Sequence, residues 1–330
     1  MPILAAFAGG VLFLQFGLTA LSGYCARKVL VGAPGGAAFA TRLRTLLNRL
    51  VLWVTLPALV FQTVHAAPLG PDLVQAPAAA IAGMAGTALV AWVLLARLYG
   101  HTPATGGLVL AASAGSVSFL GIPLVRALFG PNETQVAVYF AVLNVPLALI
   151  SGAIISSRIR DRTSTPRRSR PRATLAVCGQ GLRQLCTMPA TWALACGLAL
   201  HGTDLPAGAS RLVQLLTATV APTTMFALGL GLHFERSLAP YRMALPAVAI
   251  KLAVSPLVVF ACAWAVGLSG LPLAIVSLQG AMPTQVLSVV IAERYRLDSR
   301  LVGLTLAIDT ALAFLLLPVV LGVLQAGILV

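Results

Sequence analysis

Charged side chains are scarce in this sequence. They make up 9% of its 330 residues, whereas 59% of the residues are hydrophobic. An average soluble domain carries roughly 25% charged residues. This chain has too few charges to cover its surface in water, and it is therefore predicted to be an integral membrane protein.

Acidic residues are scarcer than basic ones. The sequence has 8 Asp and Glu against 22 Lys and Arg, which gives a net charge of +14. A strongly basic chain can be a nucleic-acid binder, but here the arginines fall in short connections between apolar segments. That placement is typical of membrane proteins, whose cytoplasmic loops are rich in Lys and Arg. No nucleic-acid partner is expected, and the basic loops favour contact with anionic lipid.

Catalytic and metal-binding motifs are also missing. The sequence contains no H-E-x-x-H, no G-x-S-x-G and no ATP-binding G-x-x-x-x-G-K-[ST]. The cysteines are scattered without C-x-x-C spacing, so neither a disulfide framework nor a metal site is expected; they are Cys25, Cys178, Cys186, Cys196 and Cys262. An intramembrane enzyme, a bound cofactor and an ATP-driven pump are therefore not expected.

Long apolar stretches dominate what is present. A helix needs about 20 apolar residues to cross a bilayer, and ten segments come near this length, the sixth being the shortest. We expect an all-α membrane protein with ten transmembrane helices. The predicted segments are residues 3–26, 43–64, 72–96, 103–128, 134–157, 188–203, 208–232, 241–266, 270–291 and 301–327.

The basic residues predict the orientation of these helices. Most of them lie in the connections that follow the first, third, fifth, seventh and ninth segments. Since Lys and Arg mark cytoplasmic loops, these connections are predicted to be cytoplasmic and both termini to lie outside. The chain is thus expected to be a multi-pass protein of the plasma (inner) membrane, with the Arg-rich stretch 158–187 in the cytoplasm.

The same stretch divides the chain into three parts: a first repeat at 1–157, the basic loop at 158–187 and a second repeat at 188–330. Each repeat holds five predicted segments. Because five is odd, the second repeat enters the membrane in the opposite sense, which predicts an inverted repeat.

Prolines recur in corresponding segments of the two halves. Pro57 and Pro222 lie in the second segment of each half, and Pro123 and Pro283 lie in the fourth. Each proline alone can be a simple kink in a packed helix. Taken as a pair, the fourth segments, "SFLGIPL" and "QGAMPTQVL", predict two interrupted helices in matching positions, because glycine stands beside each proline.

Interrupted helices point to a transport site. Non-helical backbone at membrane depth survives only where protein or a watery cavity covers it, and paired interruptions in two repeats indicate the binding site of a transporter. Half-helix N-termini offer N–H groups to an anion. The expected substrate-binding residues are Ser116, Ser118, Gly121, Pro123, Asn144, Met282, Pro283, Thr284 and Gln285.

Several of these stretches resemble the auxin efflux carrier family, including its bacterial members. The resemblance covers essentially the whole chain, in order. It rests on "RLVLWVTLPALVF" (49–61), "SFLGIPLVRALFG" (118–130), "MPATWALACGLAL" (188–200), "APTTMFALGLGL" (221–232) and "AMPTQVLSVVIAERYRLD" (281–298).

The resemblance implies ten helices in two inverted five-helix repeats, with helices 4 and 9 broken and crossing at mid-membrane, as in the bile acid:sodium symporters. It also implies secondary transport of small organic anions by a scaffold domain and a moving crossover domain. Two positions depart from the related patterns. Ser116–Phe119 replaces the family's Asn-Thr-Gly-Phe type stretch, and Gln279 stands near the place of the symporters' sodium-binding acid.

Ionisable residues inside predicted spans are candidates for ion coupling, since a charge at the helix centre costs about 2.5–3.5 kcal/mol on insertion scales. Asp309 can carry a proton or contribute to a sodium site. Lys251 can face a substrate anion, or the two can form a purely structural pair. Arg126 and Glu293 lie nearer the interface, where their side chains can reach water.

These observations predict a secondary active transporter of a small organic anion (a carboxylate, auxin-like or a short dicarboxylate) that works by alternating access and is coupled to H⁺ or Na⁺. A uniporter or channel-like protein and a sodium-coupled symporter of the bile-acid type stay open as alternatives. The expected partners are the carboxylate and membrane lipid, with a homodimer as a further option.

Overall fold

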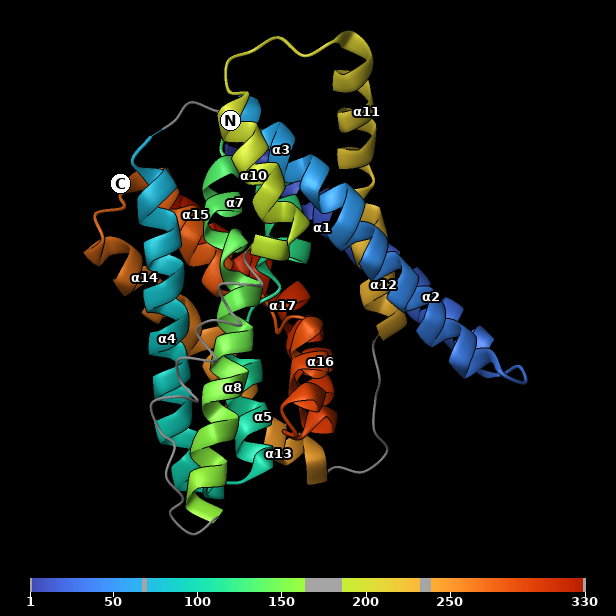
Figure 1. Ribbon diagram of the computed structural model, residues 1–330, viewed down its shortest axis with the longest axis vertical. Helices are drawn as coiled ribbons and strands as arrows, with labels where there is room; N and C mark the ends of the chain where they lie inside the picture. The colour runs from blue at the N-terminus through green and yellow to red at the C-terminus, as the bar shows by residue number, and fades with distance from the viewer. Residues whose placement is uncertain (1, 67–69, 164–185, 232–238, 329–330) are drawn as a thin grey trace. The chain divides into compact units, whose positions relative to one another are not determined.

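The computed structural model describes residues 2–66, 70–163, 186–231 and 239–328, and these residues are helical without any β-strand (Figure 1). Several helices are long and apolar enough to cross a membrane, so the chain is a multi-pass membrane protein. They are Gly36–Ala66, Asp72–Tyr99, Thr134–Ile159, Ala207–Gly231 and Ala239–Ala265. Shorter apolar helices are Pro103–Ser113, Val117–Phe129, Pro189–Ala199 and Gly270–Gly280.

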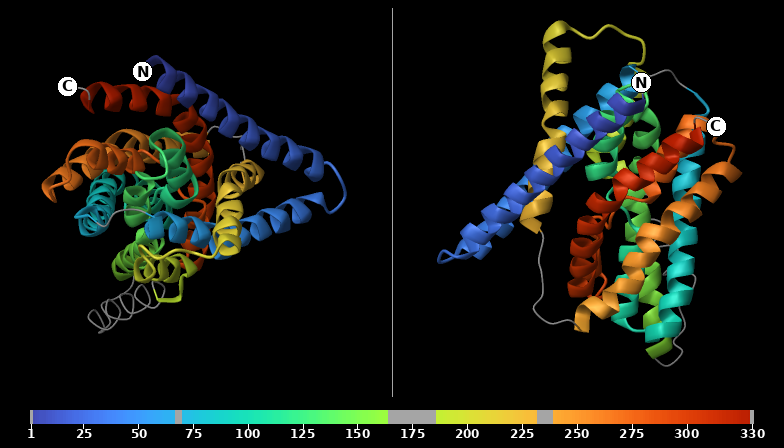
Figure 2. Two further views of the ribbon diagram at one scale, coloured as in Figure 1. Left: turned by 90° about the horizontal axis from the view of Figure 1, so that it is seen from above. Right: turned by 180° about the vertical axis from the view of Figure 1, so that it is seen from behind.

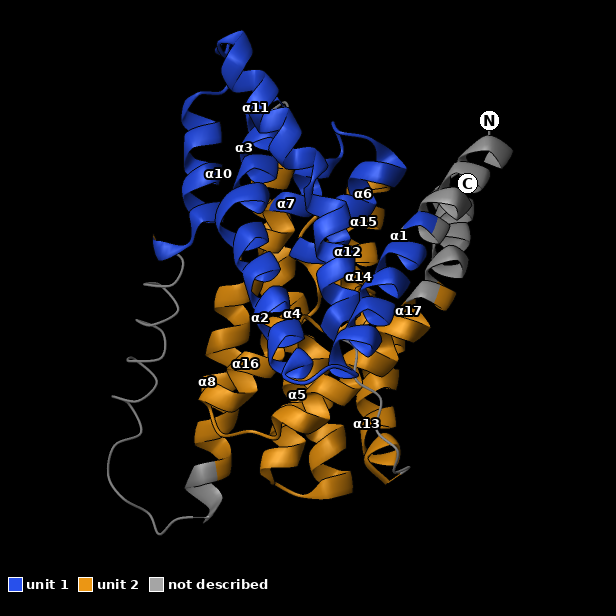
Figure 3. Cartoon of the chain, turned by 90° about the vertical axis from the view of Figure 1, so that its right-hand side faces the viewer, with its two compact units in different colours: residues 1–70, 118–138, 187–232 blue, residues 71–117, 139–186, 233–330 orange. Residues whose placement is uncertain are grey.

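The chain forms two compact units, each built from separate stretches of sequence (Figure 3). Unit 1 comprises residues 1–70, 118–138 and 187–232. Its helices are α1 (Pro2–Val31), α2 (Gly36–Leu50), η1 (Val51–Thr55), α3 (Leu56–Ala66), α6 (Ile122–Phe129), α10 (Pro189–Ala199), α11 (Ala207–Ala218) and α12 (Val220–Gly231).

Unit 2 comprises residues 71–117, 139–186 and 233–330. Its helices are α4 (Asp72–Tyr99), α5 (Pro103–Ser113), α8 (Asn144–Thr163), α13 (Ala239–Ala249), η3 (Ile250–Val254), α14 (Ser255–Ala265), α15 (Gly270–Gly280), α16 (Leu287–Arg294) and α17 (Ser299–Ile328). Two further elements, η2 (Val117–Gly121) and α7 (Thr134–Val142), have residues in both units.

Each of the ten segments predicted from the sequence overlaps a helix or consecutive helices, with ends that differ by up to seven residues. The two interruptions are also present: α5 ends ten residues before Pro123, and α15 ends just before Pro283. Residues 164–185, which hold most of the Arg-rich stretch, lie outside the described residues. The division into repeats at 1–157 and 188–330 stays a prediction.

Three π-helical turns, η1, η2 and η3, have a common cause. Each ends two residues before a proline, namely Pro57, Pro123 or Pro256. Proline has no N–H to donate, and its ring clashes with the carbonyl four residues earlier. The helix widens there into i→i+5 turns, which relieves the clash without ending the helix.

In unit 1, α1 and α2 form a helical hairpin through the turn after Val31 (Figure 2), and α1 packs along α12. Glycines let these two backbones touch. A methyl group on Gly229 would overlap the carbonyl oxygen of Ala20, and one on Gly23 would overlap that of Phe226. Close approach through small residues is how membrane helices gain packing energy, since lipid tails give no hydrophobic drive for association.

We therefore expect Gly229→Ala to lower the melting temperature of the purified protein. The added methyl group must push α1 and α12 apart, and overpacking of this kind costs about 1–3 kcal/mol. The measurement is thermal unfolding in detergent. Gly17→Ala on α1 is the control, because a side chain there meets open space; equal melting temperatures for the two variants would contradict the prediction.

In unit 2, α5 is the central helix. All of its residues from Thr105 to Ser113 are buried, and it packs against α4, α8, α13 and α17; α4 and α8 run side by side in Figure 1. Its glycines admit neighbours closely, since a methyl group on Gly107 would lie 2.7 Å from the carbonyl oxygen of Asp298. Because protein surrounds α5, the chain can leave the helical path at its end without meeting lipid.

Candidate functional site

The site lies in unit 2, where the interruptions after α5 and α15 pair with each other. The backbone is extended at Ala114, and Gly115 and Thr284 form an isolated antiparallel bridge. The Ser116 N–H donates to the Pro283 carbonyl at 2.7 Å, and the Gln285 N–H donates to the Ala114 carbonyl at 3.0 Å. Backbone groups that the two broken helices leave free thus bind one another. Buried backbone groups need such hydrogen-bond partners because water cannot reach them.

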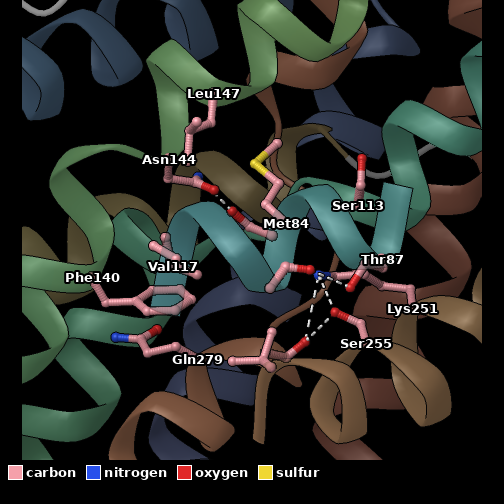
Figure 4. A pocket seen from close by; sticks show the side chains of 15 residues that line it. Met84, Thr87, Ser113, Val117, Phe140, Asn144, Leu147, Lys251, Ser255 and Gln279 are labelled. Atoms are coloured by element: carbon pink, nitrogen blue, oxygen red, sulfur yellow. Dashed lines mark hydrogen bonds between the residues drawn. The ribbon is translucent and has the colours of Figure 1, made fainter. Parts of the chain in front are cut away.

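Asn144, the first residue of α8, joins both interruptions. Its side-chain Nδ2 donates to the Gly115 carbonyl and to Gln285 Oε1, each at 2.8 Å. The side chain is buried, and its two amide hydrogens are both used. Figure 4 shows Asn144 pointing into the site from α8. One amide group therefore holds the first interruption to the second.

Asp309 on α17 forms hydrogen bonds with the interruption after α15. Its Oδ2 accepts the Thr284 N–H at 2.9 Å and also contacts the Thr284 hydroxyl. That hydroxyl lies 2.9 Å from the Ala111 carbonyl of α5. Asp309 has no exposed surface, so a carboxyl group inside unit 2 is connected to both broken helices through the single side chain of Thr284.

Lys251 on η3 reaches the carbonyl end of α15. Its Nζ lies 3.4 Å from Ser255 Oγ and 3.5 Å from the Gly280 carbonyl oxygen, and Ser255 Oγ donates to the same carbonyl at 3.0 Å (Figure 4). Within the described residues no hydrogen bond joins Lys251 to Asp309, but the two groups interact electrostatically. The structural pair, one of the alternatives drawn from the sequence, stays open.

A cavity of about 20 Å³ adjoins these groups, enough for one water molecule. None of the described residues that line it is acidic. The lining consists of Ala80, Gly83, Met84, Thr87, Ser113, Gly115, Val117, Phe140, Asn144, Leu147, Lys251, Ser255, Val259, Gln279 and Gly280 (Figure 4).

Unpartnered polar atoms surround the paired interruptions. Ser116 Oγ, Gln285 Nε2 and both side-chain polar atoms of Gln279 are buried without a hydrogen-bond partner among the described residues. A buried polar group without a partner costs about 1–3 kcal/mol. Buried atoms of this kind usually find their partners in ordered water or in a bound molecule.

The residues expected from the sequence are divided between the two units. The structure brings together Ser116, Asn144, Met282, Pro283, Thr284, Gln285, Lys251 and Asp309, all in unit 2. Ser118 and Gly121 lie on η2 and Pro123 on α6, in the stretch 118–138 that belongs to unit 1. Whether any of these residues touches a substrate stays a prediction.

Ser255, Gly280 and Gly115 were not among the site residues expected from the sequence. A signal for Ser255 was present, since it follows Lys251 by four residues and residues at this spacing share a helix face. Gly115 and Gly280 gave no such signal, because their contribution is a carbonyl group and a close approach. A Cβ on Gly115 would lie only 3.0 Å from Lys251 Nζ.

The other two charges singled out in the spans lie elsewhere. Glu293, on α16, is exposed. Arg126, on α6, is half-buried and lines a separate cavity of about 470 Å³ in unit 1. Among the described residues no group of three His, Cys, Asp or Glu side chains is placed to hold a metal ion.

Comparison with known proteins relates this chain to membrane transporters. A family model described as "Membrane transport protein" matches residues 36–321. An uncharacterized transporter of Methanothermobacter thermautotrophicus is 28% identical over 281 residues, which cover 82% of this chain and 86% of that protein. An uncharacterized transporter of Methanocaldococcus jannaschii is 20% identical over 284 residues, with 82% and 87% covered.

Proposed function

This chain belongs to the membrane transport protein family, and on that premise we propose that it moves a small organic anion across the membrane by secondary active transport. The observation that carries the proposal is the pairing of two interrupted helices, with unpartnered polar side chains beside it, in the interior of unit 2. Two such interruptions are the structural sign of a transporter binding site.

The chemistry of the site favours an anion. Gln285 Nε2 is an unused donor, and the Ser116 hydroxyl can donate as well. Helix α16 begins at Leu287, directly after the second interruption, and the positive end of its dipole favours an anion. A carboxylate accepts bonds from amide and hydroxyl donors at once. An auxin-like acid or a short dicarboxylate is the proposed substrate class.

The size of the cavity supports alternating access. About 20 Å³ holds one water molecule, whereas pockets for small ligands measure about 300–1,000 Å³. A carboxylate can therefore enter only if the site opens. We propose that unit 2, which carries the interruptions, is the moving domain and that unit 1 is the scaffold.

Asp309 is the proposed coupling residue. It is buried, and it acts through Thr284 on both broken helices. Loading and releasing a proton at this carboxyl group would add or remove a hydrogen bond where the two interruptions meet. Acidic groups inside membrane proteins commonly serve as proton relays. Coupling to sodium and uncoupled transport are the alternatives.

The proposed topology has ten spans in two inverted repeats. The composition of the units supports it, because each unit takes corresponding predicted segments from both halves. Unit 1 holds the first and second of each half (3–26, 43–64, 188–203, 208–232), and unit 2 holds the third and most of the fifth (72–96, 134–157, 241–266, 301–327). Both termini are proposed to face outward and the loop 158–187 to face the cytoplasm; lipid and a second copy of the chain are proposed partners.

The test is uptake of labelled malonate, malate and indole-3-acetate into proteoliposomes that contain the purified protein. Each acid is offered with a proton gradient, a sodium gradient or neither. We expect one acid to accumulate above its external concentration only when a proton gradient is imposed. Equilibration without accumulation under every gradient would instead identify a uniporter or channel-like protein.

A further inference from the structure

We propose that Lys251 is a built-in cation, which occupies the place at the carbonyl end of α15, beside the interruption after α5, that a mobile sodium ion would otherwise fill. The proposal rests on the transport function proposed above and extends it to the choice of ion. It predicts transport that needs no sodium in the wild-type protein, and a sodium requirement created when the ammonium group is removed.

The ammonium group of Lys251 lies at the C-terminal end of a helix. The last carbonyl groups of a helix lack partners, and they carry the negative end of the helix dipole. Helix α15 ends at Gly280, whose carbonyl oxygen lies 3.5 Å from Lys251 Nζ. Gly115, two residues past the end of α5, approaches the same nitrogen so closely that a Cβ would lie 3.0 Å from it. Lys251 therefore sits at the carbonyl end of α15 and beside the backbone that follows α5.

The carbonyl ends of broken helices are cation-binding sites in other transporters. Unwound backbone carbonyls and half-helix C-terminal ends coordinate the coupling cation there. Here the oxygens that face Lys251 are the Gly280 carbonyl and Ser255 Oγ, and the latter already donates its own hydrogen to Gly280. Its lone pairs are thus turned to the ammonium group, as they would be to a metal ion.

The surroundings of Lys251 do not suit a side chain that binds the transported anion. Lys251 is 2% exposed, and the cavity beside it holds one water molecule rather than a carboxylate. An anion placed there would face the Gly280 carbonyl oxygen, which repels it. A fixed positive charge suits the carbonyl ends, and it leaves the donors at Ser116 and Gln285 for the anion.

The experiment compares Lys251→Ala with Lys251→Met. Alanine removes the charge and leaves an oxygen-lined space for a small cation. Methionine removes the charge but fills the space with an unbranched side chain. A second space-making variant, Lys251→Ser, serves if the alanine variant folds poorly. Uptake and melting temperature are measured in sodium chloride and in choline chloride of equal concentration.

We expect the wild-type protein to respond equally to both salts. In Lys251→Ala, sodium is expected to raise uptake about tenfold and the melting temperature by about 2–4 °C over choline, because a cation that binds only the folded state stabilises it. Lys251→Met is expected to show neither effect.

Three results would overturn the proposal: sodium dependence in the wild-type protein, the absence of any sodium effect on Lys251→Ala and Lys251→Ser, or failure of both to fold even in sodium. A raised KM for the acid without rescue by cations would assign Lys251 to the substrate instead. The melting measurements need no transport, so they stand even if no acid is taken up, in which case the proposed function alone fails.

Discussion

Asp309→Asn is expected to abolish accumulation of the substrate against its gradient while downhill movement continues. Asparagine has nearly the shape of aspartic acid and keeps an oxygen that can accept the Thr284 N–H, which lies 2.9 Å from Asp309 Oδ2. It cannot take up or release a proton. If the proton enters transport at this side chain, the variant loses the link to the proton gradient and the ratio of internal to external substrate falls to one.

The measurement is the steady-state ratio of labelled acid in proteoliposomes with an inward proton gradient, together with the initial rate without one. Asp298→Asn is the matched control. Asp298 Oδ1 accepts the Leu301 N–H at 3.0 Å near the start of α17, a bond that asparagine can also accept. Accumulation by Asp309→Asn at the wild-type level would remove the coupling role; equal losses in both variants would indicate general damage to α17.

Asn144→Ala is expected to slow transport by about 100-fold, the second largest effect. The change removes two donors at once and leaves the Gly115 carbonyl and Gln285 Oε1 buried without that partner. Each orphaned group costs about 1–3 kcal/mol, and a loss of 2.7 kcal/mol corresponds to about 100-fold. The two interruptions then lose the amide that holds them together.

Initial rates over a range of substrate concentrations check this prediction, with circular dichroism to confirm that the variant is folded. Asn48→Ala, on α2 of unit 1, is the control because Asn48 is only half-buried and lies outside the site. Wild-type rates in folded Asn144→Ala protein would show that the bridge between the interruptions is dispensable.

The sequence predicted the helices and the two interruptions well, because these are local properties. Apolar length marks a span, and the glycines beside Pro123 and Pro283 mark a break. The partners inside the site could not be predicted in the same way. Thr284 bonds Ala111 across 173 positions of sequence, and Asn144 bonds Gln285 across 141. Hydrophobic periodicity says which residues are buried, but not which helices are neighbours.

Two groups of residues show this limit. Ser116 and Ser118 stand in one interrupted stretch, and nothing in the sequence indicates that the boundary between the two units falls between them. Lys251 and Asp309 carry opposite charges, but their hydrogen bonds to Gly280 and Thr284 could not be read from their own spans.

The direction in which Lys251 points depends on the number of residues in the π-helical turn η3 as well as on their identity. An α-helix advances about 100° around its axis with each residue, and a π-turn accommodates one residue more than an α-turn. Deleting one of residues 252–254 would restore a regular helix and rotate everything before it, Lys251 included, by about that angle relative to α14. Lys251 would then point away from Gly280 although no side chain had been replaced. Relatives that differ here by a single deletion would be expected to need a mobile cation at this place.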